Sequence, residues 1–212
     1  MTHTLATAAE PPARKRDAAQ TRLDLLEAAH DLFGSKGYDR TSLREIGERA
    51  GVDAALIARY FGNKMALYSA TVEADTVGTP RIASVADIER LLRRMLAKAD
   101  THGLGPIVRT AIAPSADIDP ELREVARAHI QRRIVHPLTA ALVAQGLAPD
   151  DAAMRAEQVV GMVFGAVALR ASRALPGMAE ASHDQIVATA MPAVRALCDV
   201  LDAGTTPDAG EG

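Results

Sequence analysis

Apolar side chains recur at intervals of three and four residues along most of this 212-residue chain, in segments separated by glycine and proline. Such spacing places the apolar side chains on one face of an α-helix, whereas a half-buried strand alternates at every second residue. Aromatic residues make up only 3% of the sequence and Trp is absent, so aliphatic residues and Met must build the core. That composition suits close helix packing. We therefore expect an all-α protein.

Composition also limits the class of protein. A hydrophobic content of 48% is enough to bury a core and excludes a wholly disordered chain. The single cysteine, Cys198, excludes an internal disulfide and a cysteine-rich zinc site, and we expect it to be inert packing. The first thirty residues lack a signal-peptide core, and the apolar run Val159–Leu169 is too short to span a bilayer. These features predict a cytoplasmic protein that uses no metal.

Punctuation by glycine and proline divides the chain into four segments. Residues 1–16 are predicted to be a disordered arm with a basic end, Arg14–Arg16, and residues 204–212 a flexible tail. Residues 17–77 form a head of short helices, and Gly78-Thr79-Pro80 separates it from a helical body at residues 78–203. Body helices are expected at about 84–100, 105–113, 119–145, 150–174 and 182–203, with kinks at Pro137 and Pro192.

The head contains two short helices joined at a glycine. Ser42 and Glu45 have the spacing of a capping box, which predicts the start of the first helix. Gly51 ends this helix, and Asp53 is a suitable cap for the second. Gly47 is expected at the close approach of the two helices. These are the parts of a helix-turn-helix, and we expect a three-helix DNA-binding head.

Groups suited to phosphate oxygens cluster in the same stretch. Ser42 and Arg44 lie in the first turn of the leading helix, and Tyr60 offers a hydroxyl at the end of the second. Lys64 lies at a helix N-terminus, where free amides already favour an anion. Up to Tyr68 the chain has ten basic and nine acidic residues, against fourteen and eighteen afterwards. This weak asymmetry has the sign expected of a DNA-contacting head on an acidic body.

The helix-turn-helix segment resembles the DNA-binding head of TetR-family regulators. The matching residues are Thr41–Ile46, Ala50–Val52, Leu56-Ile57, Tyr60–Lys64 and Leu67. The preceding helix, with Ala29, Phe33 and Gly37-Tyr38, fits the same pattern. The resemblance covers Asp17 to Tyr68, roughly a quarter of the chain. It implies a homodimeric regulator, most commonly a repressor, that binds a palindromic operator in double-stranded DNA. It also implies a small-molecule effector bound in the body, with no cofactor and no enzymatic activity.

The chain departs from the family pattern at Ala58, where many members carry a Tyr two positions before the one held here by Tyr60. A DNA contact is then lost or passed to Arg59 or Tyr60. Ala54 and Ala55 offer only methyl contacts to thymine, so base readout is expected from Arg44 and Arg59. The DNA-binding residues predicted in this way are Thr41, Ser42, Arg44, Ala54, Ala55, Arg59, Tyr60 and Lys64.

Each of these interpretations has an alternative. The head could be a helical hairpin that binds protein, Arg59 could be a solvated charge, and Arg14–Arg16 could be a solvating tail instead of a minor-groove contact. An enzyme on a helical bundle or a protein-binding adaptor are the rival functions for the whole chain. No metal-spaced His/Glu set, Ser-His-Asp pattern or Gly-rich phosphate loop supports an enzyme.

The body is predicted to supply a dimer interface from its last two long helices, as a two-chain four-helix bundle. Its residues would be Val160, Val163, Val167, Val194, Leu197 and Leu201. The alternative is that these stripes bury only the chain's own core. Effector binding would tilt the helix from Lys64 and move the two heads from the spacing of about 34 Å that successive grooves require.

The candidate effector pocket is built from apolar residues of several body helices. They are Leu92, Met95, Leu96, Ile107, Ile130, Ile134, Met162 and Phe164. Any one of them could equally be plain core. His129, Arg132, Arg133 and His136 share one helix face, which is either a solvated face or a site for an anionic ligand.

Overall fold

The computed structural model describes residues 18–74, 82–114 and 118–199. All regular secondary structure in these residues is helical, which confirms the all-α prediction. The predicted arm at residues 1–16, the tail at 204–212, the boundary at Gly78–Pro80 and the predicted interface residue Leu201 lie outside the described residues.

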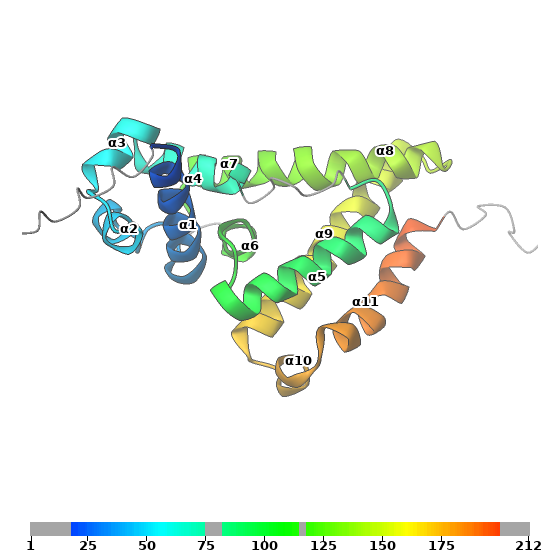
Figure 1. Ribbon diagram of the computed structural model, residues 1–212. Helices are drawn as coiled ribbons and strands as arrows, with labels where there is room; N and C mark the ends of the chain where they lie inside the picture. The colour runs from blue at the N-terminus through cyan, green and yellow to red at the C-terminus, as the bar shows by residue number, and fades with distance from the viewer. Residues whose placement is uncertain (1–17, 75–81, 115–117, 200–212) are drawn as a thin grey trace, which may run out of the picture.

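The head lies at one end of the molecule and consists of α1 (Ala18–Lys36), α2 (Leu43–Ala50), α3 (Ala55–Phe61) and α4 (Lys64–Ala74) (Figure 1). Helix α1 packs on α2 and α4, and α3 packs on α4. Their contact is fully buried at Leu25, Ala29, Ile46, Ile57 and Leu67. The three- and four-residue spacing of the apolar positions therefore produces the expected core of the head.

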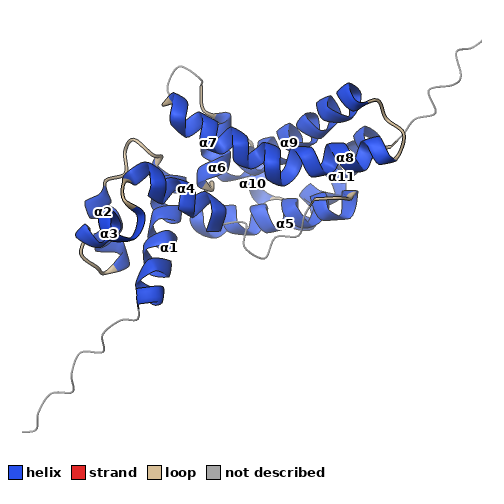
Figure 2. Cartoon of the chain, turned by 90° about the horizontal axis from the view of Figure 1, so that it is seen from above, coloured by secondary structure: helices blue, strands red, loops and turns tan. Residues whose placement is uncertain are grey.

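The body contains the remaining helices, and Figure 2 shows it extending away from the head. They are α5 (Val85–His102), α6 (Pro106–Ile112), α7 (Pro120–Ile130), α8 (His136–Ala144), α9 (Pro149–Ser172), α10 (Pro176–Glu180) and α11 (His183–Cys198). Helix α9 packs against α5, α8 and α11. The short α10 was not predicted, and α11 ends at Cys198, where the sequence predicted a helix to residue 203.

The single helix predicted at residues 119–145 is interrupted by a π-helical turn, η2 (Gln131–Val135), between α7 and α8. Pro137 follows this turn at the start of α8. Proline lacks the N–H that an α-helix would bond to the carbonyl four residues earlier, and its ring collides with that carbonyl. A wider turn before Pro137 relieves this conflict. The predicted irregularity is therefore an inserted π-turn.

Helix α9 has the length and apolar composition needed to cross a bilayer, which the eleven-residue run Val159–Leu169 alone did not indicate. Its buried face, however, belongs to the core of this chain, with Val159, Val163 and Val167 at most 2% exposed. The apolar character of α9 is thus explained by its central position in the body, among α5, α8 and α11.

Head and body are joined by direct contacts of α6 with α1 and α4. The guanidinium of Arg109 on α6 donates to the carbonyls of Gly34 (2.6 Å) and Ser35 (2.9 Å) at the end of α1. Gly34 lies so close to the turn before α6 that a Cβ there would be 2.3 Å from the Leu104 carbonyl oxygen. Gly34 lies inside α1, where the lack of a side chain permits this close approach.

Candidate nucleic-acid interface

Helix α2 begins at a complete capping box. Ser42 Oγ accepts from the Glu45 amide (3.2 Å), and the Glu45 carboxylate accepts from the Ser42 amide (2.8 Å). Lys36 donates to the same carboxylate at 2.6 Å and, together with Ser42, holds the pKa of Glu45 at about 2. Glu45 is thus a structural cap, as the sequence indicated, and its charge fixes the first turn of α2.

A tight left-handed turn joins α2 to α3. Gly51 has φ +65° and ψ +35°, which glycine adopts at little cost. Gly47 lies against the start of α3, where a Cβ would be 2.9 Å from the Ala54 amide nitrogen. The two glycines therefore set the angle of the helix pair, as predicted from their positions.

Helix α3 begins one residue later than Asp53 alone predicts. Ala54 occupies the cap position, and Asp53 Oδ1 accepts from the Ala55 amide at 2.8 Å. Helix α4 follows after Gly62, and Asn63 Oδ1 accepts from the Ala66 amide at 2.7 Å. Both polar caps thus satisfy amides at the helix starts. Only Ile57 of α3 is fully buried, so the helix keeps a broad outer face.

The outer face of the helix pair carries the predicted base-reading groups. The Arg44 side chain is 87% exposed, with Nε 2.7 Å from Glu48 Oε1. Arg59 and Ala55 on α3 are exposed, Ala54 is half-buried, and Ser42 is exposed beside Arg44. An exposed arginine–carboxylate pair contributes little to stability, so Arg44 can exchange Glu48 for another acceptor at small cost.

Thr41 does not belong to this surface, which corrects its assignment as a DNA-contacting residue. Its side chain is 1% exposed, and its hydroxyl donates within the fold to the carbonyls of Gly37 (2.8 Å) and Leu32 (3.2 Å). A hydroxyl committed to two buried carbonyls is not available to a phosphate. Thr41 instead anchors the turn between α1 and α2.

Tyr60 and Lys64 lie at the edge of the same surface, both half-buried. Lys64 Nζ is 4.2 Å from the ring centroid of Tyr38, a cation–π contact, and burial lowers the pKa of this amine. Arg59 lies over the ring of Tyr60, with 6.0 Å between the guanidinium carbon and the ring centroid. Arg22, which sequence reasoning missed, lies in the same way over Phe61 at 5.1 Å. Its position on α1 gave no signal in the sequence.

Two family models match this chain. The model for bacterial regulatory proteins of the tetR family covers residues 25–71, which contain the helix pair just described. The model for the tetracyclin repressor-like C-terminal domain covers residues 88–197, more than half of the chain. The chain belongs to the TetR family. Members of this family are regulatory proteins and not enzymes, so the rival interpretation as a helical-bundle enzyme is excluded.

Curated relatives with HTH-type regulator names match parts of the chain. The transcriptional regulator TtgR of Pseudomonas putida is 39% identical over 59 residues, which are 28% of each chain. The transcriptional repressor AcnR of Corynebacterium efficiens is 27% identical over 103 residues, 49% of this chain and 54% of AcnR. The chain thus spans about half or less of the length of these relatives.

Solved structures share the fold of this chain. A TetR-family regulator from Rhodococcus sp. has a TM-score of 0.64 at 17% identity, over 85% of this chain and 100% of that one. GusR of Salmonella enterica has a TM-score of 0.63 at 17% identity, over 88% of this chain and 99% of that one. The likeness extends through head and body, and at this identity it concerns the fold alone.

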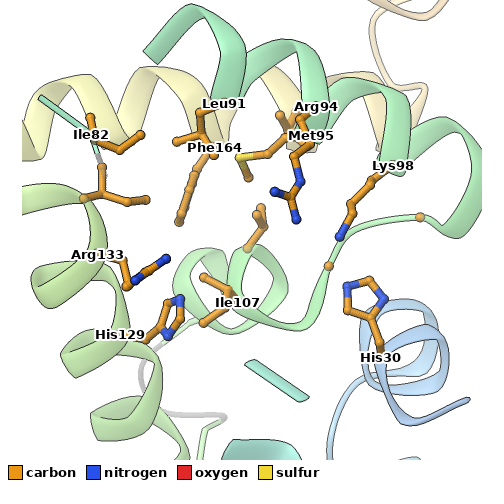
Figure 3. A pocket seen from close by; sticks show the side chains of 15 residues that line it. His30, Ile82, Leu91, Arg94, Met95, Lys98, Ile107, His129, Arg133 and Phe164 are labelled. Atoms are coloured by element: carbon orange, nitrogen blue, oxygen red, sulfur yellow. The ribbon is translucent and has the colours of Figure 1, made fainter. Parts of the chain in front are cut away.

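The body of this TetR-family chain contains a cavity of about 90 Å³ next to the junction with the head (Figure 3). Helices α1, α5, α6, α7 and α9, the turn η2 and the loop before α6 surround it. Its lining residues are His30, Ile82, Leu91, Arg94, Met95, Lys98, Gly103, Gly105, Ile107, Val108, His129, Arg133, Ile134, Phe164 and Val167.

Half of the predicted pocket residues line this cavity: Met95, Ile107, Ile134 and Phe164. Leu92 and Leu96 are buried in the core, on the other side of α5, and do not line it. Ile130 lines a separate surface depression, and Met162 is half-buried against the core. The apolar pattern alone could not separate cavity wall from core, because both need the same side chains.

The sequence analysis missed the basic residues of the cavity wall on α5. Leu91, Arg94, Met95 and Lys98 lie at positions i, i+3, i+4 and i+7, so one helix face carries apolar and basic side chains together. Of the predicted basic stripe, His129 and Arg133 line the cavity, whereas Arg132 pairs with Glu73 of α4 and His136 is exposed. The available sequence signal was the presence of Arg94 and Lys98 on the same helix face as Leu91 and Met95.

The predicted interface residues are largely part of the chain's own core. Val163, Val167 and Val194 are at most 2% exposed, so a second chain cannot reach them without opening the fold. Val160 and Leu197 are half-buried. The exposed side of α9 instead carries Met154, Gly161 and Leu169. Periodicity identified α9 and α11 correctly as apolar, but it could not assign their faces.

Within the described ranges, no group of three or more His, Cys, Asp or Glu side chains could hold a metal ion. Cys198 is buried, and burial raises the pKa of its thiol.

Proposed function

We propose that this protein is a cytoplasmic, homodimeric repressor that binds a palindromic operator in duplex DNA and is released by a small-molecule effector. One observation carries the proposal. The α2–Gly51–α3 unit presents exposed Arg44 and Arg59 on its outer face, while α1 and α4, on which the unit packs, contact the walls of the body cavity.

In the proposed complex α3 lies in the major groove and α2 crosses the DNA backbone. Arg44 and Arg59 read base edges, with guanine as the preferred partner, and Ala54 and Ala55 contact thymine methyl groups. Ser42, Tyr60 and Lys64 bind phosphate oxygens, which fix the orientation of the head but carry no sequence information. The exposure of Ser42 and Arg44 and the edge position of Lys64 support these roles.

A dimer is proposed because one helix-turn-helix covers only a half-site. Its interface uses the outer face of α9, where Met154 is 58% and Leu169 is 41% exposed. Between them, a Cβ added at Gly161 or Gly165 would meet no atom within 4 Å, so the helix surface is open there. Two copies of α9 can approach closely at such glycines, and the flanking apolar side chains then become buried.

The effector is proposed to act through the junction of head and body. The cavity is smaller than the roughly 300–1,000 Å³ of most small-molecule sites, so a larger ligand must displace part of its wall. Gly103 and Gly105 of that wall flank Leu104, whose carbonyl lies against Gly34 of α1. A ligand that moves this loop therefore moves α1, and with it the DNA-binding unit, in proportion to its preference for the moved state.

Selection of fragments from the genome of origin, followed by fluorescence anisotropy, tests the proposal. We expect recovery of a palindrome and an affinity that falls steeply with salt concentration. Arg59→Ala should weaken binding, whereas Arg127→Ala should not, because Arg127 is an exposed arginine of the body paired to Glu124 three residues before. Absence of binding to any duplex at low ionic strength would refute the proposed function.

A further inference from the structure

The charged side chains that line the body cavity, among the described residues, are all basic. Arg94 and Lys98 extend from α5, and Arg133 extends from η2 on the opposite wall (Figure 3). Two imidazoles, His30 of α1 and His129 of α7, complete the polar lining. No described Asp or Glu lines the cavity, although the whole chain has more acidic than basic residues.

The remaining wall is apolar. In Figure 3, Leu91, Met95 and Phe164 lie on the upper side of the cavity and Ile107 lies below them, and Ile134 also lines the cavity. A ligand in this cavity therefore meets an aliphatic and aromatic surface along its body and guanidinium and ammonium groups at its polar end. This combination selects for an amphipathic molecule.

We propose that the cavity binds an organic anion in which a carboxylate is attached to a small apolar body. The proposal rests on the function proposed above, since it names the class of effector for that site. The carboxylate is held between Arg133 and the α5 pair Arg94 and Lys98, and the apolar body lies against Met95 and Phe164.

Guanidinium geometry supports this assignment. Arginine binds a carboxylate through two parallel N–H···O bonds, and such charge-assisted bonds are stronger and shorter than those between neutral groups. Opposite charges also attract more strongly in a partly enclosed, weakly polar cavity than in water. The same wall repels an amine, so a cationic ligand of equal size is disfavoured.

His129 places the proposed site in contact with the head. Its ring is 4% exposed and lines the cavity, and Nδ1 lies 3.5 Å from Glu73 Oε1 on α4. Glu73 also pairs with Arg132, the neighbour of Arg133. An anion that draws Arg133 inwards therefore moves the turn η2, which also carries Arg132, the partner of Glu73 on α4. The ligand class and the route to the DNA-binding unit thus share one set of residues.

Calorimetric titration of the full-length protein tests the proposal, with hexanoate and benzoate as probes and hexanamide, benzamide and hexylamine as matched controls. We expect the affinity for each acid to be at least about ten times that for its amide, and the affinity for the amine to be the lowest. Arg133→Gln and Arg94→Gln should each weaken the acids about tenfold and leave the amides unchanged. Arg127→Gln is the matched control, because Arg127 is an exposed arginine that lies outside the cavity lining.

Arg133→Lys distinguishes charge from folding, because it should restore part of the acid affinity if the role of Arg133 is electrostatic. Circular dichroism establishes that each variant folds. Equal affinities for acid and amide, absence of acid binding, or acid binding that is indifferent to Arg94 and Arg133 would each overturn the proposal. Acid binding without operator release would support the anion site and refute the effector switch. Operator release by a neutral ligand, with no acid binding, would refute the anion site and support the effector switch.

Discussion

The hydroxyl of Tyr68 on α4 lies 2.8 Å from Oγ1 of Thr110 on α6, in a buried contact between head and body. The Tyr68 ring also packs edge-on against Phe33 and Tyr38, with centroids 5.5 and 5.6 Å away. Burial raises the pKa of Tyr68 to about 12, so the phenol stays protonated and able to donate at physiological pH. The aromatic cluster of the head thus ends in a hydrogen bond to the body.

Replacement of this hydroxyl tests the coupling. Tyr68→Phe should lower the free energy of unfolding by about 1–2 kcal/mol, because one buried hydrogen bond is lost and Thr110 keeps a buried polar atom. Urea unfolding of Tyr68→Phe, Thr110→Val and the double variant forms a cycle. A double variant that is no less stable than Tyr68→Phe alone supports a shared bond, whereas additive losses would contradict it.

The second prediction concerns Gly34, where α1 meets the Leu104 carbonyl. Gly34→Ala should destabilise the protein by about 1–3 kcal/mol, since a methyl group at 2.3 Å from a backbone oxygen forces α1 and the loop apart. Gly177→Ala is the matched control, because a Cβ there meets no atom within 4 Å. Thermal unfolding of both variants measures the difference. A Gly34→Ala variant as stable as the control would mean that the junction is loosely packed.

Two substitutions separate phosphate contact from base readout. Lys64→Ala should weaken binding to all duplexes alike and reduce the salt slope by about 1. Arg44→Ala should cost about 1–3 kcal/mol and relax preference at one base position. Anisotropy titrations over a panel of operator variants at several salt concentrations measure both effects. Uniform weakening by Arg44→Ala would assign this residue to the backbone instead.

A substitution on α9 tests the proposed dimer. Gly161→Arg should convert a dimer into monomers of 22.3 kDa, because a charged side chain would be placed on the open face of α9. Light scattering after size exclusion reports the mass, with Gly177→Arg on α10 as an exposed control. A variant that remains dimeric would show that the interface lies elsewhere on the body.

The buried imidazole of His129 predicts a pH dependence. Burial, the largest effect, and the nearby Arg132 and Arg133 lower its pKa in the folded state, while Glu73 opposes the shift. The unfolded chain therefore binds the proton more readily, so stability falls as the pH drops below about 6.5, the ordinary value of the group. His129→Gln removes this contribution. Urea unfolding at pH 7.5 and 5.0 should show a smaller loss for the variant than for the wild type, and equal losses would contradict the assignment.

Local signals in the sequence were sufficient to predict the helix-turn-helix. The capping box at Ser42 and the helix end at Gly51 each depend on a few neighbouring residues, and each forms as expected. Thr41 was misassigned because its assignment also used only local sequence signals. In the sequence the Thr41 hydroxyl appears free to contact DNA because it lies next to the capping box. Only the fold shows that it donates hydrogen bonds to the carbonyls of Leu32 and Gly37.

Tertiary features were harder to predict, since they depend on which apolar face meets which partner. Val163 and Val194 have the spacing of an interface, but the chain uses them to pack its own helices. The cavity depends on small gaps between packed helices, and periodicity carries no information about gaps. The role of Gly34 was not predicted, because the carbonyl that it admits belongs to residue 104, seventy positions away.

The π-turn at Gln131–Val135 has a consequence for the whole body. Each residue of an α-helix advances the chain by about 100° around its axis, so the extra residue of a wide turn sets the rotational phase of everything that follows. Leu138 and Leu142 of α8 face inwards only in this phase. The wide turn takes up one residue more than a regular α-turn, so a regular α-helix through the same sequence would rotate Leu138 and Leu142 by about 100° away from the core. The number of residues before Pro137 is therefore coupled to the presence of the π-turn.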